Sequence, residues 1–162
     1  MQLAVLLLLW LFAAQTHADI LIGQVVGIES GDTIRLVDQN SRSMRVRLIG
    51  IAAPRLQQPF GKESQSHLGS LLSGQQVNVL WNKRSADGAL VGKVMLAAPG
   101  GQPQDAGLQQ IDDGMAWWHL ETVEDLGQAD RGAYQHAEFD AKIHRRGLWR
   151  DTNPQPPWKW PR

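Results

Sequence analysis

The spacing of apolar residues in the first half of the chain predicts a small β-structure. Short β-branched runs between residues 20 and 37 are interrupted at Gly31-Asp32, a pair that favours a turn, so a β-hairpin is predicted there. A third strand is predicted over residues 44–53, where apolar residues recur at roughly every second position. Two more strands are predicted at 76–81 and 90–96, joined by the charged turn NKRSADGA. Five short strands are typical of an OB-type barrel.

Helical periodicity sets in after Pro59. Leu68, Leu71 and Leu72 share one face of a helix predicted over residues 61–72. Two further helices are predicted near 108–118 and near 130–146, and Gly147 ends the second. The tail TNPQPPWKWPR contains too many prolines for a helix or a central strand. The predicted fold class is therefore mainly β with α, a five-stranded barrel with one interposed helix and two C-terminal helices.

The first 18 residues, MQLAVLLLLWLFAAQTHA, are typical of a secretory signal peptide that is cleaved after Ala18. The apolar block from Leu3 to Ala14 is shorter than the roughly 20 residues that a membrane-spanning helix needs. This segment contains no Lys or Arg, so an uncleaved anchor and a buried first helix stay open as alternatives. We expect an exported protein, periplasmic or secreted, with no membrane span after signal removal, a domain at 19–150 and a Pro/Trp-rich tail at 151–162.

Composition narrows the classes of function. The chain has no cysteine, which excludes disulfides, thiolate metal sites and any cysteine-based cofactor. Lys and Arg together number 16 and Asp and Glu number 16, so the chain lacks the overall positive charge of many nucleic-acid-binding proteins. Nothing in the composition indicates an oligomeric state.

A series of ordered motifs from residue 20 to residue 162 carries a family resemblance. They are SGDTI (30–34), VRLIGI (46–51), QPFGKE (58–63), VGKV (91–94), DGMAW (113–117), GLW (147–149) and PWKW (157–160). In this order they resemble the motifs of the staphylococcal nuclease (thermonuclease) family, which has the OB-fold barrel described above. Several motifs in register are far more specific than one short pattern.

The resemblance implies a mechanism as well as a fold. Members of this family hydrolyse phosphodiester bonds of DNA and RNA with one Ca²⁺, which two aspartates and a backbone carbonyl bind. A glutamate is the proposed general base, and two arginines bind the phosphate. The metal and the arginines offset the negative charge that develops on the phosphate, and the carboxylate activates water.

Two of these family positions keep suitable residues in this chain and three do not. Asp32 stands at the first Ca²⁺-ligand position and Arg47 at the first phosphate-binding position. The second Ca²⁺ ligand is replaced by Ala52, the general base by Arg55 and the second arginine by Ala89. An alanine ligates nothing, and a guanidinium stays protonated and cannot accept a proton. Ca²⁺ is therefore the cofactor that the family implies, but its binding here is doubtful.

Loss of a general base typically slows a reaction by about 10²- to 10⁴-fold, and loss of a transition-state arginine by about 10³- to 10⁵-fold. We therefore expect lost or strongly reduced phosphodiesterase activity. If the family geometry holds, Arg47 and Arg55 lie close together at the barrel mouth and suit a phosphate or carboxylate. Lys83 and Arg84, in the predicted turn before Asp87, are further candidates for anion binding. Nucleic acid, DNA or RNA, is the expected partner.

Two other functions stay open from the sequence. The first is an active endonuclease with an altered centre, in which Asp32 and Arg47 act with recruited groups such as Lys83 or Glu63. The second is a cell-envelope protein-interaction module that uses the tail around Trp158 and a vestigial site. An OB barrel by itself supports none of these functions over the others.

Several candidate residues also have a purely structural interpretation, which we favour for most of them. Asp32 is also a common turn former. His136, Asp140 and His144 share a helix face that could chelate a transition metal, but this spacing also describes a solvent-facing stripe. Glu63 and His67 are interpreted as helix surface. The tryptophans Trp117, Trp118, Trp149, Trp158 and Trp160 could stack on bases, but the family motifs place Trp117 and Trp149 in the core, so the stacking hypothesis rests on the tail pair.

Overall fold

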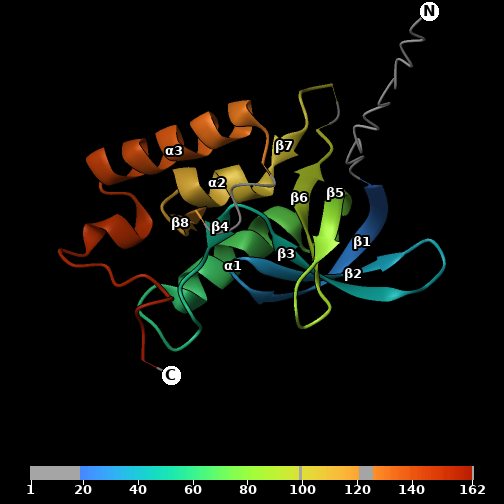
Figure 1. Ribbon diagram of the computed structural model, residues 1–162, viewed down its shortest axis with the longest axis horizontal. Coiled ribbons are helices and arrows are strands. Elements are labelled where there is room, and N and C mark those ends of the chain that lie inside the picture. The colour runs from blue at the N-terminus through green and yellow to red at the C-terminus, as the bar shows by residue number, and fades with distance from the viewer. Residues whose placement is uncertain (1–18, 99, 121–125, 162) are drawn as a thin grey trace, which may run out of the picture.

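The computed structural model describes residues 19–98, 100–120 and 126–161, which form a β-barrel with helices packed against it (Figure 1). The predicted signal peptide at residues 1–18 lies outside the described residues, so its assignment stays a prediction. Within the described part of the chain, no helix combines the length and the hydropathy needed to cross a bilayer.

Five strands form the barrel, as the sequence predicted. They are β1 (Asp19–Ser30), β2 (Thr33–Asp38), β3 (Ser43–Leu48), β5 (Gln76–Arg84) and β6 (Leu90–Leu96). Neighbouring strands follow the order β3-β2-β1-β5-β6 in antiparallel pairs, and a parallel pairing of β3 with β6 closes the ring. Two register shifts along β1 bend this long strand so that it pairs with β5 in its first half and with β2 in its second.

Three helices cover the barrel. α1 (Gly61–Leu72) has the predicted bounds and buries Leu68 and Leu72 in the core. α2 (Ala106–Asp112) packs against α3 (Gln128–Ile143), and Figure 1 shows α3 along the outer side of α2. The remaining elements are short: β4 (Ile51–Ala52), β7 (Gln104–Asp105), β8 (Trp117–Trp118) and the 3₁₀ helix η2 (Gly147–Arg150).

The helix predicted near residues 108–118 is shorter than expected. α2 ends at Asp112, and Trp117 and Trp118 instead form β8, which pairs antiparallel with β4. The cause lies at Gly114, whose φ of +68° is a left-handed conformation that ends a helix. A Cβ at this position would lie 2.2 Å from the Arg146 carbonyl oxygen, so the chain crosses another backbone segment here.

Two strand predictions also need correction. The third predicted strand, 44–53, is divided, because β3 ends at Leu48 and a turn at Ile49-Gly50 separates it from β4. The strand predicted at 76–81 extends to Arg84, so Lys83 and Arg84 belong to β5 rather than to the turn. Pairing with β6 explains this extension, since Lys83 and Arg84 lie opposite Val91 and Leu90.

A half-buried charge network attaches α3 to the barrel. The Lys93 Nζ of β6 lies 2.7 Å from Asp130 Oδ1 and 3.4 Å from Asp105 Oδ2. Burial alone would lower the pKa of Lys93, but these two carboxylates outweigh burial and raise it. The Tyr134 hydroxyl donates to Asp105 Oδ2 at 2.8 Å, and burial, together with that negative charge, raises the pKa of Tyr134. Lys93 therefore stays charged and ties three elements together.

The start of α1 provides a test of how tightly the preceding loop is packed. A Cβ on Gly61 would lie 1.9 Å from the Arg55 carbonyl oxygen, so Gly61→Ala must displace the loop that carries Arg55. Overpacking of this kind costs about 1–3 kcal/mol. Urea unfolding of the variant is expected to show a loss of that size.

Gly132→Ala in α3 is the matched control for this substitution. An added Cβ there meets nothing within 4 Å, and alanine in a helix interior is expected to stabilise the protein by about 0.5–1 kcal/mol. Equal unfolding free energies of the two variants would contradict the packing at Gly61.

Candidate functional site

A cleft of about 810 Å³ opens where the β1–β2 turn meets the end of β3. Its walls are residues 29, 30, 32 and 33 of the β1–β2 hairpin, Arg45, Arg47 and Leu48 of β3, residues 51–55, His119 and the tail pair Pro157-Trp158. The structure thus brings Asp32, Arg47, Ala52 and Arg55 into one cleft.

The Asp32 carboxylate accepts hydrogen bonds from residues of its own turn and from the segment after β4. Its Oδ1 accepts hydrogen bonds from Ser30 Oγ at 2.6 Å and Thr33 Oγ1 at 3.0 Å, and its Oδ2 accepts one from the Ala53 backbone N–H at 2.9 Å. A carboxylate has about four acceptor sites, so three are occupied by protein donors. These bonds connect the β1–β2 turn to the segment after β4, which agrees with the structural interpretation of Asp32.

A buried glutamine, Gln110, also supports the β1–β2 turn through a hydrogen bond to its backbone. Gln110 of α2 has no exposed surface, and its Nε2 donates to the Gly31 carbonyl at 2.6 Å. Its Oε1 accepts from His67 Nδ1 at 2.5 Å, while His67 Nε2 lies 3.1 Å from Asp113 Oδ2. The interpretation of His67 as helix surface is therefore wrong, because α2 packs over this side of α1. No local sequence signal marked Gln110, whose role depends on the contact between the two helices.

Arg55 and Ala52 stand where the family would place carboxylates. Ala52 lies in β4 opposite Trp117, and Arg55 is exposed in the loop that follows. Among the described residues, Arg55 has no ion-pair partner. Its backbone N–H donates to the Oε1 of buried Gln58 at 3.1 Å, and Gln58 Nε2 donates in turn to the Gln155 carbonyl of the tail. One amide side chain therefore fixes both the Arg55 loop and the tail.

The arginines of β3, Arg45 and Arg47, form ion pairs with nearby carboxylates. Arg45 bonds Glu29 Oε2 at 2.7 Å and Asp87 Oδ2 at 3.0 Å, and Arg47 lies 3.5 Å from the same Asp87 oxygen. Burial tends to raise the pKa of Glu29, but hydrogen bonds from Arg35 and Arg45 outweigh it and lower the pKa. Glu29 is therefore an ion-pair partner with no sign of a proton-accepting role.

Asp87, in the β5–β6 turn, pairs with two arginines of the cleft wall, Arg45 and Arg47. A hydrogen bond from Ser85, together with Arg45 and Arg47, lowers the pKa of Asp87 to about 2, although burial opposes the shift. Asp87 is therefore ionised at neutral pH and offsets part of the positive charge of these two arginines. Ala89 is buried, at 1% exposure, and offers no cationic group.

The residues present do not fit a Ca²⁺ ion as the family resemblance implies. A hard cation of this kind takes 6 to 8 oxygen ligands, usually including several carboxylates. Asp32 is the first position, but three protein donors occupy its oxygens, and Ala52 has no oxygen on its side chain. No group of three or more potential metal-ligating side chains occurs among the described residues.

Lys83 and Arg84, the other two predicted anion-binding residues, do not line this cleft. The Arg84 guanidinium bonds the Gly88 carbonyl at 3.0 Å and lies 5.4 Å from the centre of the Trp81 ring. Lys83 is exposed on β5. Glu63 is exposed in the first turn of α1 and is also absent from the cleft walls.

The tryptophans differ in how far their side chains are buried. Trp117 is 7% exposed and packs edge-on against Trp149 and Trp158, with centroids 5.9 and 6.3 Å apart. Trp149 and Trp160 are half-buried, and Trp118 pairs in β8. Trp158 is 50% exposed and lines the cleft.

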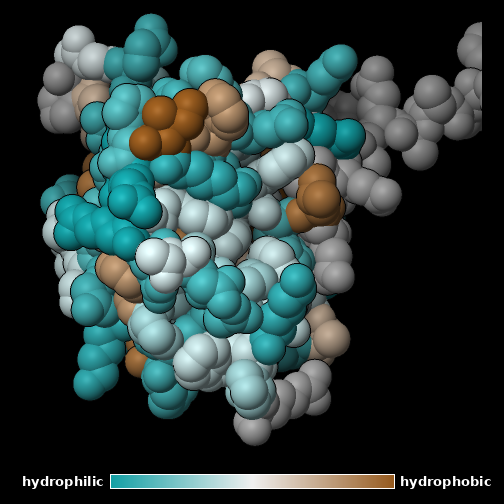
Figure 2. All heavy atoms as spheres, turned by 90° about the vertical axis from the view of Figure 1, so that its left-hand side faces the viewer, coloured by the Kyte–Doolittle hydropathy of each residue, from teal (hydrophilic) through white to brown (hydrophobic). Residues whose placement is uncertain are grey.

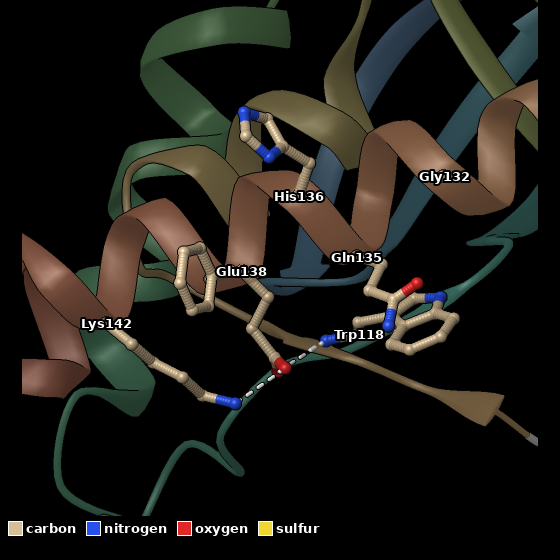
Figure 3. A pocket seen from close by; sticks show the side chains of 7 residues that line it. Trp118, Gly132, Gln135, His136, Glu138 and Lys142 are labelled. Carbon is tan, nitrogen blue, oxygen red and sulfur yellow. Dashed lines mark hydrogen bonds and ion pairs between the residues drawn. The ribbon is translucent and has the colours of Figure 1, made fainter.

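A second hollow of about 440 Å³ lies beside α3, between Trp118 and Lys142. In Figure 3, Glu138 accepts from the Trp118 backbone N–H and from Lys142, and His136 points to the opposite side of α3 from Trp118. The His136 side chain is 75% exposed, with its Nε2 3.6 Å from Asp140 Oδ2. His144 Nδ1 contacts the Asp140 carbonyl oxygen, so these residues form an exposed helix stripe.

Comparison with known proteins agrees with this fold. The family model described as "Staphylococcal nuclease homologue" matches residues 45–151. A micrococcal nuclease of Shigella flexneri is 37% identical over 144 residues, covering 86% of this chain and 80% of that protein. An uncharacterized endonuclease of Escherichia coli O157:H7 is 30% identical over 154 residues, covering 95% and 94%. Protein ParB of Escherichia coli is 34% identical over 145 residues, covering 86% and 78%. Because the family model matches more than half of the chain and these relatives are at least 30% identical over most of it, the chain belongs to the staphylococcal nuclease family.

Proposed function

We propose that this protein is an exported member of the family that has lost most or all Ca²⁺-dependent phosphodiesterase activity and binds nucleic acid or another phosphate-bearing anion in the cleft. The observation that carries the proposal is Arg55. An exposed guanidinium lies in the same cleft as Arg47, where the family resemblance calls for a general base. The substitution exchanges a proton acceptor for a permanent positive charge.

The charges of the cleft support anion binding over cation binding. Three arginines and two carboxylates line it, and both carboxylates, Glu29 and Asp32, already accept bonds from protein donors. Guanidinium groups bind phosphate oxygens through two parallel hydrogen bonds, a geometry that Arg47 and Arg55 can offer from the cleft walls. Binding to the phosphate backbone needs no particular base sequence.

An active nuclease with an altered centre is the second candidate. The name of the Shigella flexneri relative, micrococcal nuclease, favours it at 37% identity. The chemistry of the cleft opposes it, because its carboxylates Glu29 and Asp32 already accept bonds from protein donors and Arg55 stands at the position of the general base. Lys83 and Glu63, the groups considered for recruitment, lie outside the cleft walls.

A protein-interaction role has less support. Figure 2 shows the face that contains the end of α3 as mostly hydrophilic, with hydrophobic side chains in small separate groups. Surfaces that bind proteins tightly usually present larger continuous apolar patches.

Arg47→Ala and Arg55→Ala test the binding proposal. Each removes one phosphate contact, so each is expected to weaken binding of a labelled single-stranded DNA and to reduce the salt slope of log K by about 0.7. Fluorescence anisotropy in EDTA over a series of salt concentrations measures both quantities.

Two variants make this test specific. Arg42→Ala removes an arginine that pairs with Asp38 at the far end of β2, and its affinity should equal that of the wild type. Asp87→Ala removes the internal competitor of Arg45 and Arg47 and should bind more tightly. Unchanged affinity in both cleft-arginine variants would refute the proposal.

Export can be tested through the N-terminus of the mature protein. Asp19 is the first residue of β1, so removal of residues 1–18 leaves every described element intact. After expression in a bacterium with a periplasm, mass spectrometry is expected to find the protein in the periplasm or medium with Asp19 as its first residue. An intact Met1 in the cytoplasmic fraction would contradict export.

A further inference from the structure

Trp158 lines the cleft, and half of the surface of this large aromatic side chain is exposed to solvent. It is 50% exposed, whereas the neighbouring Trp117 is 7% exposed. Packing therefore does not account for the whole indole, because burial of an aromatic ring is one of the larger favourable contributions available to a fold.

The backbone around Trp158 is held firmly, so the position of the ring is defined. Pro157 is buried, and the Lys159 N–H donates to the Pro156 carbonyl at 3.0 Å. Further back, the Gln155 carbonyl accepts the hydrogen bond from Gln58 Nε2. Gln58 is only 5% exposed, and because it also binds the Arg55 backbone, it sets the spacing between the cation and the indole.

The contacts of Trp158 orient its ring without covering it by a parallel stack. Trp117 meets it at an interplanar angle of 71°, and His119 lies 5.0 Å away at 46°. In the described part of the chain, no other aromatic ring or cationic side chain lies over the indole. One edge contact and one tilted contact orient the tryptophan while leaving ring surface for a ligand.

We propose that Trp158, with His119 beside it, is a stacking platform for an unpaired nucleobase whose phosphate binds Arg47 and Arg55. All four side chains line the same cleft. This inference rests on the proposed function and specifies its ligand as single-stranded nucleic acid. In a duplex the faces of the bases are covered by their neighbours, whereas an unpaired base can stack on an aromatic ring with little regard to its identity.

Two oligonucleotides of the same length separate the platform from the cationic site. One is single-stranded oligodeoxythymidylate of roughly ten nucleotides, within the range that one OB barrel binds, and the other is an abasic deoxyribose-phosphate strand. Binding of each to the full mature chain is measured by competition against a labelled strand in EDTA, so that no hydrolysis intervenes. The wild type is expected to prefer the strand with bases by about 5- to 150-fold, the range found for one stacked base.

Trp158→Leu should remove this preference and leave the affinity for the abasic strand unchanged. Trp158→Phe keeps an aromatic face and should retain part of the preference, which a role in packing alone would not predict. Urea unfolding of both variants verifies that the tail substitution leaves the domain folded.

The outcomes distinguish the two proposals. Equal wild-type binding of both strands, or a preference that survives in Trp158→Leu, would refute the platform while anion binding stands. If neither strand binds the wild type, the proposed function fails and the platform fails with it.

Discussion

The parallel pairing of β3 with β6 is the constraint on which the site depends. It closes the barrel through Val46–Leu90, Arg47–Val91 and Leu48–Gly92. The same register places Arg47 beside the turn that carries Asp87, at 3.5 Å between their charged groups. Closure removes the two edges of the sheet and also creates the cleft wall. A cation at position 47 is thus fixed by the barrel itself and needs no bound metal to position it.

The β1–β2 turn gives Asp32 a structural role. Asp32 bonds Ser30, Thr33 and the Ala53 backbone, and Gln110 holds the Gly31 carbonyl from the opposite side. Removal of a partner from such a buried set leaves a polar group unsatisfied, typically at about 1–3 kcal/mol. Hydrogen bonds within the protein therefore support the geometry of the turn. Retention of Asp32 alone is consequently weak evidence for catalysis.

Much of this architecture could be predicted from local patterns. The β1–β2 turn at Gly31-Asp32, the helix at 61–72 and the five-strand barrel follow from turn chemistry and periodicity, and the motifs placed Arg47 and Arg55 together. The motifs also assign three replaced positions to Ala52, Arg55 and Ala89, and these assignments stay predictions.

What could not be predicted depends on contacts between distant segments. α2 stops at Asp112 because Gly114 crosses the backbone at Arg146, and β5 continues to Arg84 because β6 pairs with it. The network of Lys93, Asp105 and Tyr134 and the burial of Gln110 arise only when α2 and α3 meet the barrel. The position of Trp158 likewise depends on the tail, which folds back to Gln58.

The rate of Ca²⁺-dependent hydrolysis of single-stranded DNA and RNA tests the central claim most directly. The measurement compares the mature wild type, Asp32→Ala and the double variant Ala52→Asp/Arg55→Glu, each in Ca²⁺ and in EDTA. We predict no Ca²⁺-dependent hydrolysis by the wild type at high protein concentration, and a measurable gain in the double variant, which regains a ligand and a base. Ca²⁺-dependent hydrolysis by the wild type that Asp32→Ala abolishes would contradict it.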